Sequence, residues 1–173
     1  MLRVTTGPEM RNKLIDMGET SGQWMLKIIG EGLDIARIEA GAMQLEIQTV
    51  DLHQFMIDLK ALKSQRAEDL GINFSLRLAR GVPRWVKVDP LRLRQILVNL
   101  IGNSFKFTSK GEVSVKLGVA GPPDGGKQMF SFSISDSGVG ISDEFKRIMF
   151  EPFTQATRRS ESREHGIGLG LVI

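Results

Sequence analysis

PLRLRQILVNLIGNSFKFT, residues 90–108, is the stretch of sequence that decides the fold. Apolar side chains recur along it at three- and four-residue steps, which predicts a helix that is apolar on most sides. Pro90 suits the first turn of this helix, because the missing N–H of a proline would have had no partner there. Asp89 immediately precedes it and is a good N-cap residue. The stretch therefore predicts a largely buried helix with a defined start.

One stripe of this helix carries amides in place of the glutamates and lysines of a solvated face. At 3.6 residues per turn the stripe covers about a quarter of the circumference. Its members are Arg92, Gln95, Asn99, Asn103 and Lys106. Amide oxygens can orient a hydrated metal ion without adding charge, and a lysine can meet phosphate. The stripe indicates one side of a binding site for a metal ion and phosphate groups. A helix that is merely polar on one side would show the same pattern.

The composition excludes several classes of site. The 173 residues are enough for one core with a small appendage, and 23 basic against 20 acidic residues are too balanced to indicate a nucleic-acid binder. The sequence has no cysteine, so disulfides and thiolate metal sites are excluded. Two histidines, His53 and His165, are too few for a multi-histidine metal site. No apolar run reaches membrane-spanning length.

The N-terminal part predicts one long helix. Apolar residues recur at helical spacing from residue 9 to about residue 40, and Gly41 is a plausible C-cap. A single helix cannot bury its own apolar stripe. We therefore expect a partner helix, supplied either by a second copy of the chain or by sequence outside it.

The remaining chain alternates between strands and helices. Asp51 is expected to cap a second helix, over 51–70, which Gly71 ends. The apolar residues expected to face inward from it are Phe55, Leu59 and Leu62. Strands are predicted over 45–50, 72–78, 85–88, 113–119 and 129–135, the last two as a hairpin, and a short helix over 142–150.

Two glycine-rich segments could approach a ligand. In DSGVGI, residues 136–141, the paired glycines allow close approach of the backbone, and Asp136 could accept a hydrogen bond from an amino group such as that of adenine. In GIGLG, residues 166–170, a glycine-rich backbone precedes a helix start, which is the geometry of a phosphate cradle. Each could also be a simple turn. Neither has the spacing of a dinucleotide fingerprint or a P-loop.

Taken in order, these segments resemble the ATP-binding domain of sensor histidine kinases of the hybrid type, with the GHKL fold. Residues 99–108 are similar to the N box, 136–140 to the G1 box, 150–153 to the F box and 166–171 to the G2 box. Residues 21–41 resemble the end of the dimerisation hairpin. Four motifs in the right order and spacing make the resemblance specific.

The resemblance implies ATP and Mg²⁺ as cofactors and assigns a role to each motif. Asn103 would be the Mg²⁺ ligand, Asn99 and Lys106 would meet the phosphates, and Asp136 would hold adenine. Gly138 and Gly140 would let the adenine pocket close. A lid bending over the phosphates would use Gly166, Gly168 and Gly170, with Arg158, Arg159 or Arg163 approaching the γ-phosphate. No residue of the chain is assigned as a catalytic group.

The same resemblance implies an α/β (α+β) fold, a two-layer sandwich of a mixed β-sheet and helices preceded by a long α-helix. Residues 1–41 would be the second helix of a dimerisation and phosphoacceptor hairpin, and residues 42–173 an ATP-binding domain without its C-terminal helix and strands. We therefore expect a chain truncated at both ends.

The phosphate-accepting histidine of this family lies in a Ser-His-Glu-type motif, which this sequence lacks. His53 and His165 are interpreted as structural or incidental. The implied partners are a histidine-containing hairpin and the receiver domain of a response regulator, with a dimer formed through the N-terminal helix. No contact with nucleic acid or with a membrane is expected, and the implied location is the cytoplasm, even where the parent kinase is membrane-anchored.

Two other readings remain open. A stand-alone ATPase of the superfamily that includes DNA gyrase and heat-shock chaperones would use a glutamate at the first N-box position, where this chain has Asn99, which cannot act as a base. A non-catalytic module would instead use its N-terminal helix to capture a full-length kinase.

Overall fold

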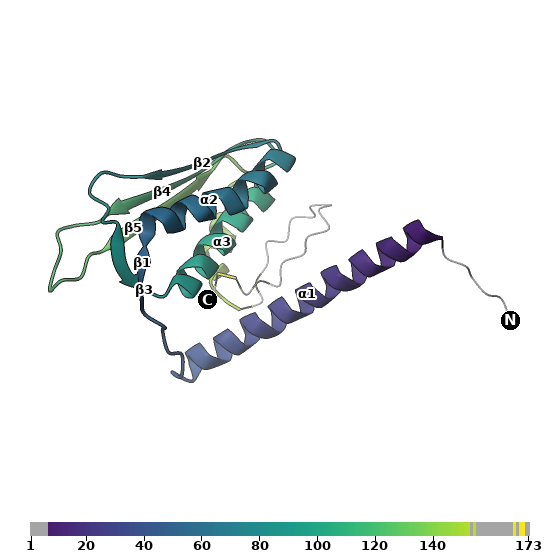
Figure 1. The fold of residues 1–173 in the computed structure, drawn as a ribbon, viewed down its shortest axis with the longest axis horizontal. Coiled ribbons are helices and arrows are strands. Elements are labelled where there is room, and N and C mark those ends of the chain that lie inside the picture. The colour runs from purple at the N-terminus through teal and green to yellow at the C-terminus, as the bar shows by residue number, and fades with distance from the viewer. Residues whose placement is uncertain (1–6, 153, 155–167, 169, 172–173) are drawn as a thin grey trace. The chain divides into compact units, whose positions relative to one another are not determined.

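The structure is a computed structural model, and it describes residues 7–152, 154, 168, 170 and 171. The chain divides into two compact units, Met1–Met43 with Phe150–Ile173, and Gln44–Met149. In chain order its helices and strands are α1 (Pro8–Glu39), β1 (Gln48–Asp51), α2 (Leu52–Asp69), β2 (Ile72–Leu78), β3 (Trp85–Val88), α3 (Pro90–Phe107), β4 (Gly111–Val119), β5 (Phe130–Asp136) and α4 (Asp143–Ile148) (Figure 1).

A three-stranded mixed sheet forms one layer of the unit Gln44–Met149. Its strand order is β2-β4-β5, with β2 parallel to β4 and β4 antiparallel to β5. Val115 of β4 lies opposite Leu76 on one side and Ile134 on the other. Helices α2 and α3 lie on one face of this sheet (Figure 1). The predicted fold class, including the hairpin of the last two strands, is confirmed.

The core lies between these helices and the sheet. Every second residue of β4 points into it, because side chains alternate along a strand. Phe105 of α3 meets Phe74 of β2 edge to face, with ring centroids 5.2 Å apart. The fully buried apolar side chains are Leu52, Met56, Leu59, Leu97, Ile101, Val113, Val115 and Leu117. This packing holds α3 in place across the sheet.

One predicted core residue of α2 is wrong. Phe55 and Leu59 are buried as expected, but Leu62 is 56% exposed. Met56 is buried in its place, at 0% exposure, and Ala67 continues the buried side in the last turns. At 3.6 residues per turn, Leu52, Met56, Leu59 and Ala67 lie on one side of the helix, and this side forms the buried stripe. Leu62 lies at the border of this stripe.

Two aspartates fix the starts of α2 and α3, as the sequence predicts. Asp51 Oδ1 accepts the Gln54 N–H at 3.0 Å, and Asp51 Oδ2 lies 2.9 Å from Arg84 Nε. Asp89 Oδ1 accepts the N–H groups of Leu91 and Arg92, both at 3.0 Å, while Asp89 Oδ2 accepts the Glu46 N–H at 2.9 Å. This last bond occupies a backbone group that the sequence had placed in a strand, so β1 begins only at Gln48.

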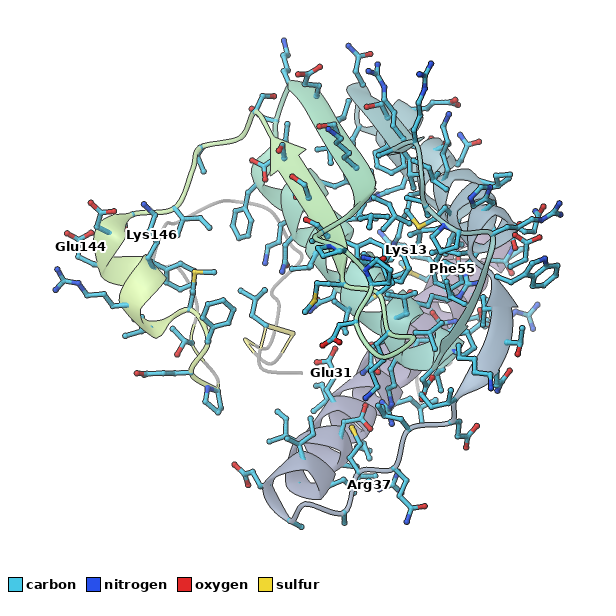
Figure 2. The ribbon with its side chains drawn as sticks, turned by 90° about the vertical axis from the view of Figure 1, so that its left-hand side faces the viewer. Lys13, Glu31, Arg37, Phe55, Glu144 and Lys146 are labelled. Carbon is cyan, nitrogen blue, oxygen red and sulfur yellow. The ribbon has the colours of Figure 1, made fainter. Side chains whose placement is uncertain are left out.

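Helix α1 belongs to the other unit and ends as predicted. Gly41 has a φ of +64°, and its N–H donates to Ile38 O at 3.0 Å, while the Ala42 N–H donates to Arg37 O at 2.8 Å. These two bonds are the glycine-dependent C-cap that satisfies the last carbonyls of a helix. Figure 2 shows Arg37 and Glu31 on this helix. Large apolar residues, including Met10, Leu14, Met17 and Met25, are exposed along it.

A membrane span is not found among the described helices, since each is too short or too polar to cross a bilayer.

Candidate functional site

The amide stripe of α3 lies at the border of the core. Asn99, Asn103 and Lys106 are half-buried, whereas the neighbouring face of the helix is buried. That buried face consists of Leu97, Ile101, Ser104 and Phe105. The apolar face of the helix therefore packs on the sheet, while the amide stripe lies at the border of the core, where a ligand could reach it.

Within the described part of the chain, the Asn103 side chain has unused bonding capacity. Within the part of the chain that the structure describes, no hydrogen bond to its side chain is found. Further up the stripe, Arg92 Nη1 donates to Gln95 Oε1 at 2.7 Å. In the last turn, Lys106 Nζ lies 5.4 Å from the centroid of the Phe107 ring. An amide with a spare carbonyl oxygen and an ammonium group thus lie one turn apart on one helix.

Asp136 is the last residue of β5. It is exposed, and its Oδ1 accepts the Gly138 N–H at 3.1 Å, which starts a turn out of the sheet. In register it lies opposite Val113 of β4. The strand thus ends in a carboxylate that is oriented by the turn following it.

The turn after Asp136 packs against the C-terminal end of α3. The Val139 N–H donates to Phe107 O at 3.3 Å. A Cβ atom at Gly138 would overlap Phe107 O and lie 3.0 Å from Asp136 Oδ1. Only glycine fits at this position. Asp136 and the end of the amide stripe are therefore joined through one close backbone contact, which the sequence alone did not show.

The other glycines of the predicted site are placed less completely. Gly140 has a φ of +71° and Gly168 a φ of +79°, conformations that favour glycine. Gly170 lies in a turn. Gly166, His165 and the three lid arginines (Arg158, Arg159 and Arg163) lie outside the described residues. Gly168 and Gly170 belong to the unit that contains α1, so they are not placed relative to Asn103.

Sequence reasoning missed two residues that meet where the start of β4 lies beside the end of β5. Ser137 Oγ accepts the Glu112 N–H at 2.9 Å, and a Cβ atom at Gly111 would overlap this oxygen. Gly111 itself has a φ of +117°. The only available signal was a hydroxyl within DSGVG and a glycine before the preceding strand, and sequence spacing does not reveal that they meet.

The two capping aspartates have perturbed acidities. Hydrogen bonds from the backbone N–H groups of Arg92 and Glu46 lower the pKa of Asp89. The Gln54 N–H lowers the pKa of Asp51, with a further contribution from Arg84. Each carboxylate is therefore stabilised in its charged form by the fold. His53 lies at the start of α2 with Nε2 3.1 Å from Val82 O, a contact that suits a structural role.

The second half of the chain matches a known family. Residues 88–173, which begin one residue before the Asp89 cap, match the model described as histidine kinase-, DNA gyrase B-, and HSP90-like ATPase. This part of the chain belongs to that family. The matched region contains α3, β4, β5 and α4, and with them the amide stripe and Asp136.

Similar proteins of this ATPase family are sensor kinases. The chain is 37% identical to the virulence sensor protein BvgS of Bordetella pertussis over 97% of its own length, and 34% identical to the signal transduction histidine-protein kinase BarA of Escherichia coli over 99%. It spans 14% and 18% of the length of these two relatives. The crystal structure of full-length ShkA in complex with AMPPNP superposes with a TM-score of 0.74 and 32% identity, covering 98% of this chain and 33% of ShkA.

Proposed function

We propose that residues 42–173 form the Mg-ATP-binding catalytic domain of a sensor histidine kinase, which transfers the γ-phosphoryl group of ATP to a histidine on a dimerisation hairpin. The observation that carries the proposal is the half-buried Asn103 amide, which has no hydrogen-bond partner in the described part of the chain and lies on a helix joined by a close contact to the Asp136 turn. Because this side chain is only half-buried, its amide can reach a ligand without breaking a bond within the described part of the chain.

The residues present fit a magnesium ion that is shared with a nucleotide. The described residues contain no cluster of three acidic or histidine side chains that could hold a metal by themselves. Mg²⁺ suits such a site, because it keeps several waters and binds through one or two protein oxygens and the substrate phosphates. Asn103 would supply the protein oxygen, and Asn99 and Lys106 would contact the phosphates. The bound ion would supply neutralisation of the phosphate charge.

The adenine base would be recognised by the turn after β5, which contacts the end of α3. Asp136 presents an exposed carboxylate that can accept a hydrogen bond from the amino group of adenine. Gly138 and Gly140 would let the adenine pocket close, and Gly166, Gly168 and Gly170 are proposed to form the hinge of a lid over the phosphates. The AMPPNP complex of ShkA supports ATP as the ligand, since AMPPNP is an analogue of ATP.

The phosphate acceptor would come from another hairpin, because the sequence has no Ser-His-Glu-type motif. Residues 1–41 are proposed to be the second helix of such a hairpin, and the exposed apolar residues of α1 support a helical partner for it. The receiver domain of a response regulator is the proposed downstream partner. The proposed location is the cytoplasm, because the domain would draw on ATP there.

The test is calorimetric binding of Mg-ATP to the 173-residue chain and to Asn103→Ala. We expect the unmodified chain to bind, and the substitution to weaken binding by at least about tenfold, since a contact with a charged group contributes about 1.5–3 kcal/mol. The matched control is Asn73→Ala, an exposed asparagine of β2. No Mg-ATP binding by the folded chain, or equal binding by Asn103→Ala, would refute the proposal.

A second assay separates the kinase from its two alternatives. A hairpin that carries the accepting histidine is mixed with the chain and radiolabelled ATP, and we expect label on the hairpin. Rapid ATP hydrolysis without transfer would favour a stand-alone ATPase. Nucleotide binding without transfer or hydrolysis, together with capture of a full-length kinase, would favour the non-catalytic module.

A further inference from the structure

The hydrogen-bond ladder between β4 and β5 ends with a bond to a side chain in place of a bond to a backbone carbonyl. In an antiparallel pair, directly opposed residues alternately exchange two backbone N–H···O bonds. Beyond the last strand pair, Val113 with Asp136, the Ser137 N–H donates to Glu112 O at 3.0 Å. The return bond differs, because the Glu112 N–H donates to Ser137 Oγ at 2.9 Å. The Ser137 hydroxyl thus replaces a backbone carbonyl in the rung.

This replacement lets the backbone leave the sheet directly after Asp136. The Ser137 carbonyl is released from the ladder, and the chain can turn toward the Phe107 carbonyl, which the Val139 N–H reaches. The hydroxyl proton has two acceptors within range, Glu112 O at 3.3 Å and Lys110 O at 3.5 Å. The side chain and backbone of Ser137 therefore both hold the start of β4.

Gly111 provides the space for this hydroxyl. A Cβ atom at Gly111 would overlap Ser137 Oγ and lie 3.3 Å from Ser137 Cβ, and its φ of +117° is a conformation that other residues rarely adopt. Residues 111 and 137 lie far apart in the sequence but occupy one site. Gly111 and Ser137 form a clasp that connects the start of β4 to the end of β5.

We propose that Ser137 is a positioning residue that holds the Asp136 carboxylate for recognition of the adenine amino group. The proposal rests on the proposed function and adds the determinant of base selectivity. Asp136 itself has one bond that orients it, from the Gly138 N–H at 3.1 Å, and the described residues provide no bond to its Oδ2. Its direction therefore depends on the backbone of residues 137 and 138, which the clasp anchors on one side and Phe107 on the other.

The chemistry predicts a specific loss. A base with an amino group donates to a carboxylate, whereas a base with an oxo group at the same position is an acceptor and is repelled. A misplaced carboxylate would weaken binding of ATP, whereas binding of inosine triphosphate, which has an oxo group in place of the amino group, would stay the same or become tighter. The readout is therefore the ratio of ATP affinity to inosine triphosphate affinity, which a general loss of stability would not change.

The experiment compares Ser137→Ala, Ser137→Thr and the control Ser135→Ala in the full chain, with both nucleotides as Mg²⁺ complexes. Ser135 is an exposed serine of β5, two residues before Ser137. We expect Ser137→Ala to reduce ATP affinity and the affinity ratio by about fivefold to tenfold, because a displaced carboxylate keeps only part of its hydrogen bond to the amino group. Ser137→Thr, which keeps the hydroxyl, and Ser135→Ala should retain the ratio of the unmodified chain.

Equal losses for both nucleotides in Ser137→Ala, or an unchanged ratio, would overturn the inference while leaving the proposed function intact. Absence of Mg-ATP binding by the unmodified chain would overturn both. If Ser137→Ala does not fold, amide hydrogen exchange of the unmodified chain decides. The Glu112 amide should then exchange more slowly than the exposed, unbonded amide of a loop residue, and fast exchange at Glu112 would show that no clasp exists.

Discussion

Helices α1 and α3 start alike and end in opposite situations. Both have proline in the first turn and apolar side chains at helical spacing. Helix α3 buries Leu97, Ile101 and Phe105 against strands of its own unit, whereas α1 leaves Leu14, Met17 and Met25 more than half exposed. The comparison teaches that a helical pattern identifies which face needs cover and says nothing about what covers it.

The difference lies in what each helix meets within its own unit. Helix α3 follows β3 directly and precedes β4, so the chain brings it back onto the sheet, where Phe105 contacts Phe74. The described part of the unit that contains α1 holds no strand. A buried apolar face contributes to stability, while an exposed one remains available for association.

The largest expected effect is a loss of stability on truncating a buried side chain of α3. Ile101 is 0% exposed and Leu14 is 53% exposed. We expect Ile101→Ala to lower the free energy of unfolding by about 2–5 kcal/mol, because it leaves a cavity in the core. Leu14→Ala in the monomeric chain should cost less than about 0.5 kcal/mol. Urea unfolding at low protein concentration measures both, and equal costs would contradict the exposure of α1.

A second prediction compares two glycines, one in the turn that contacts the end of α3 and one within α3 itself. A Cβ at Gly138 would overlap the Phe107 carbonyl, so Gly138→Ala should cost about 1–3 kcal/mol as the backbone shifts, and should weaken Mg-ATP binding. The control, Gly102→Ala within α3, meets open space and should stabilise the chain by about 0.5–1 kcal/mol. Thermal unfolding of the two variants should move in opposite directions.

A third prediction tests whether α1 finds its cover in a second copy. If it does, Ile28→Asp should raise the dimer dissociation constant by at least about tenfold, because a carboxylate would be buried in an apolar contact. The conservative Ile28→Val should change it little. Sedimentation over a range of concentrations gives both constants. Dimers of unchanged affinity in Ile28→Asp would place the contact on another face.

The smallest expected effect is the pH dependence that the capping aspartates confer. The pKa of Asp89 is lowered by backbone N–H donors in the folded chain, so its contribution to stability is complete above the ordinary carboxyl pKa of about 4. This contribution is lost as pH falls through the lowered pKa of the folded state. Stability should stay level from about pH 7 to pH 5 and decline below about pH 4.

Asp89→Asn is the matched variant for this pH dependence, since an asparagine retains a cap oxygen but does not titrate in this range. Chemical denaturation at several pH values should show a shallower acid decline in Asp89→Asn than in the unmodified chain. An identical decline would remove Asp89 as its source.

Local sequence signals determined the elements of this protein. Pro90 after Asp89, Asp51 before Leu52, Gly41 and Gly71 each mark a helix end by chemistry within a few residues, and the structure has the ends there. The alternation over residues 72–78 likewise matches β2. The fold class was implied by the resemblance that the motifs carry, and the family match supports the motifs that lie on α3 and after β5.

Other features were decided only by packing. Leu62 is exposed although it was expected to face inward, and Met56 is buried, because the sheet surface determines which side of α2 is covered. The Gly138 contact with Phe107 and the Gly111–Ser137 clasp join residues that no sequence spacing connects.

The sequence by itself determined the order of helices and strands, the capped helix ends, and which residue types carry the chemistry of the candidate site, because caps, periodicity and donor atoms are local properties. Only the tertiary structure decided which of those residues meet, since close approach of two backbones depends on how distant segments share one surface. The amide stripe could be predicted from the sequence of one helix, whereas the anchoring of the Asp136 turn required α3, β4 and β5 to be in place together.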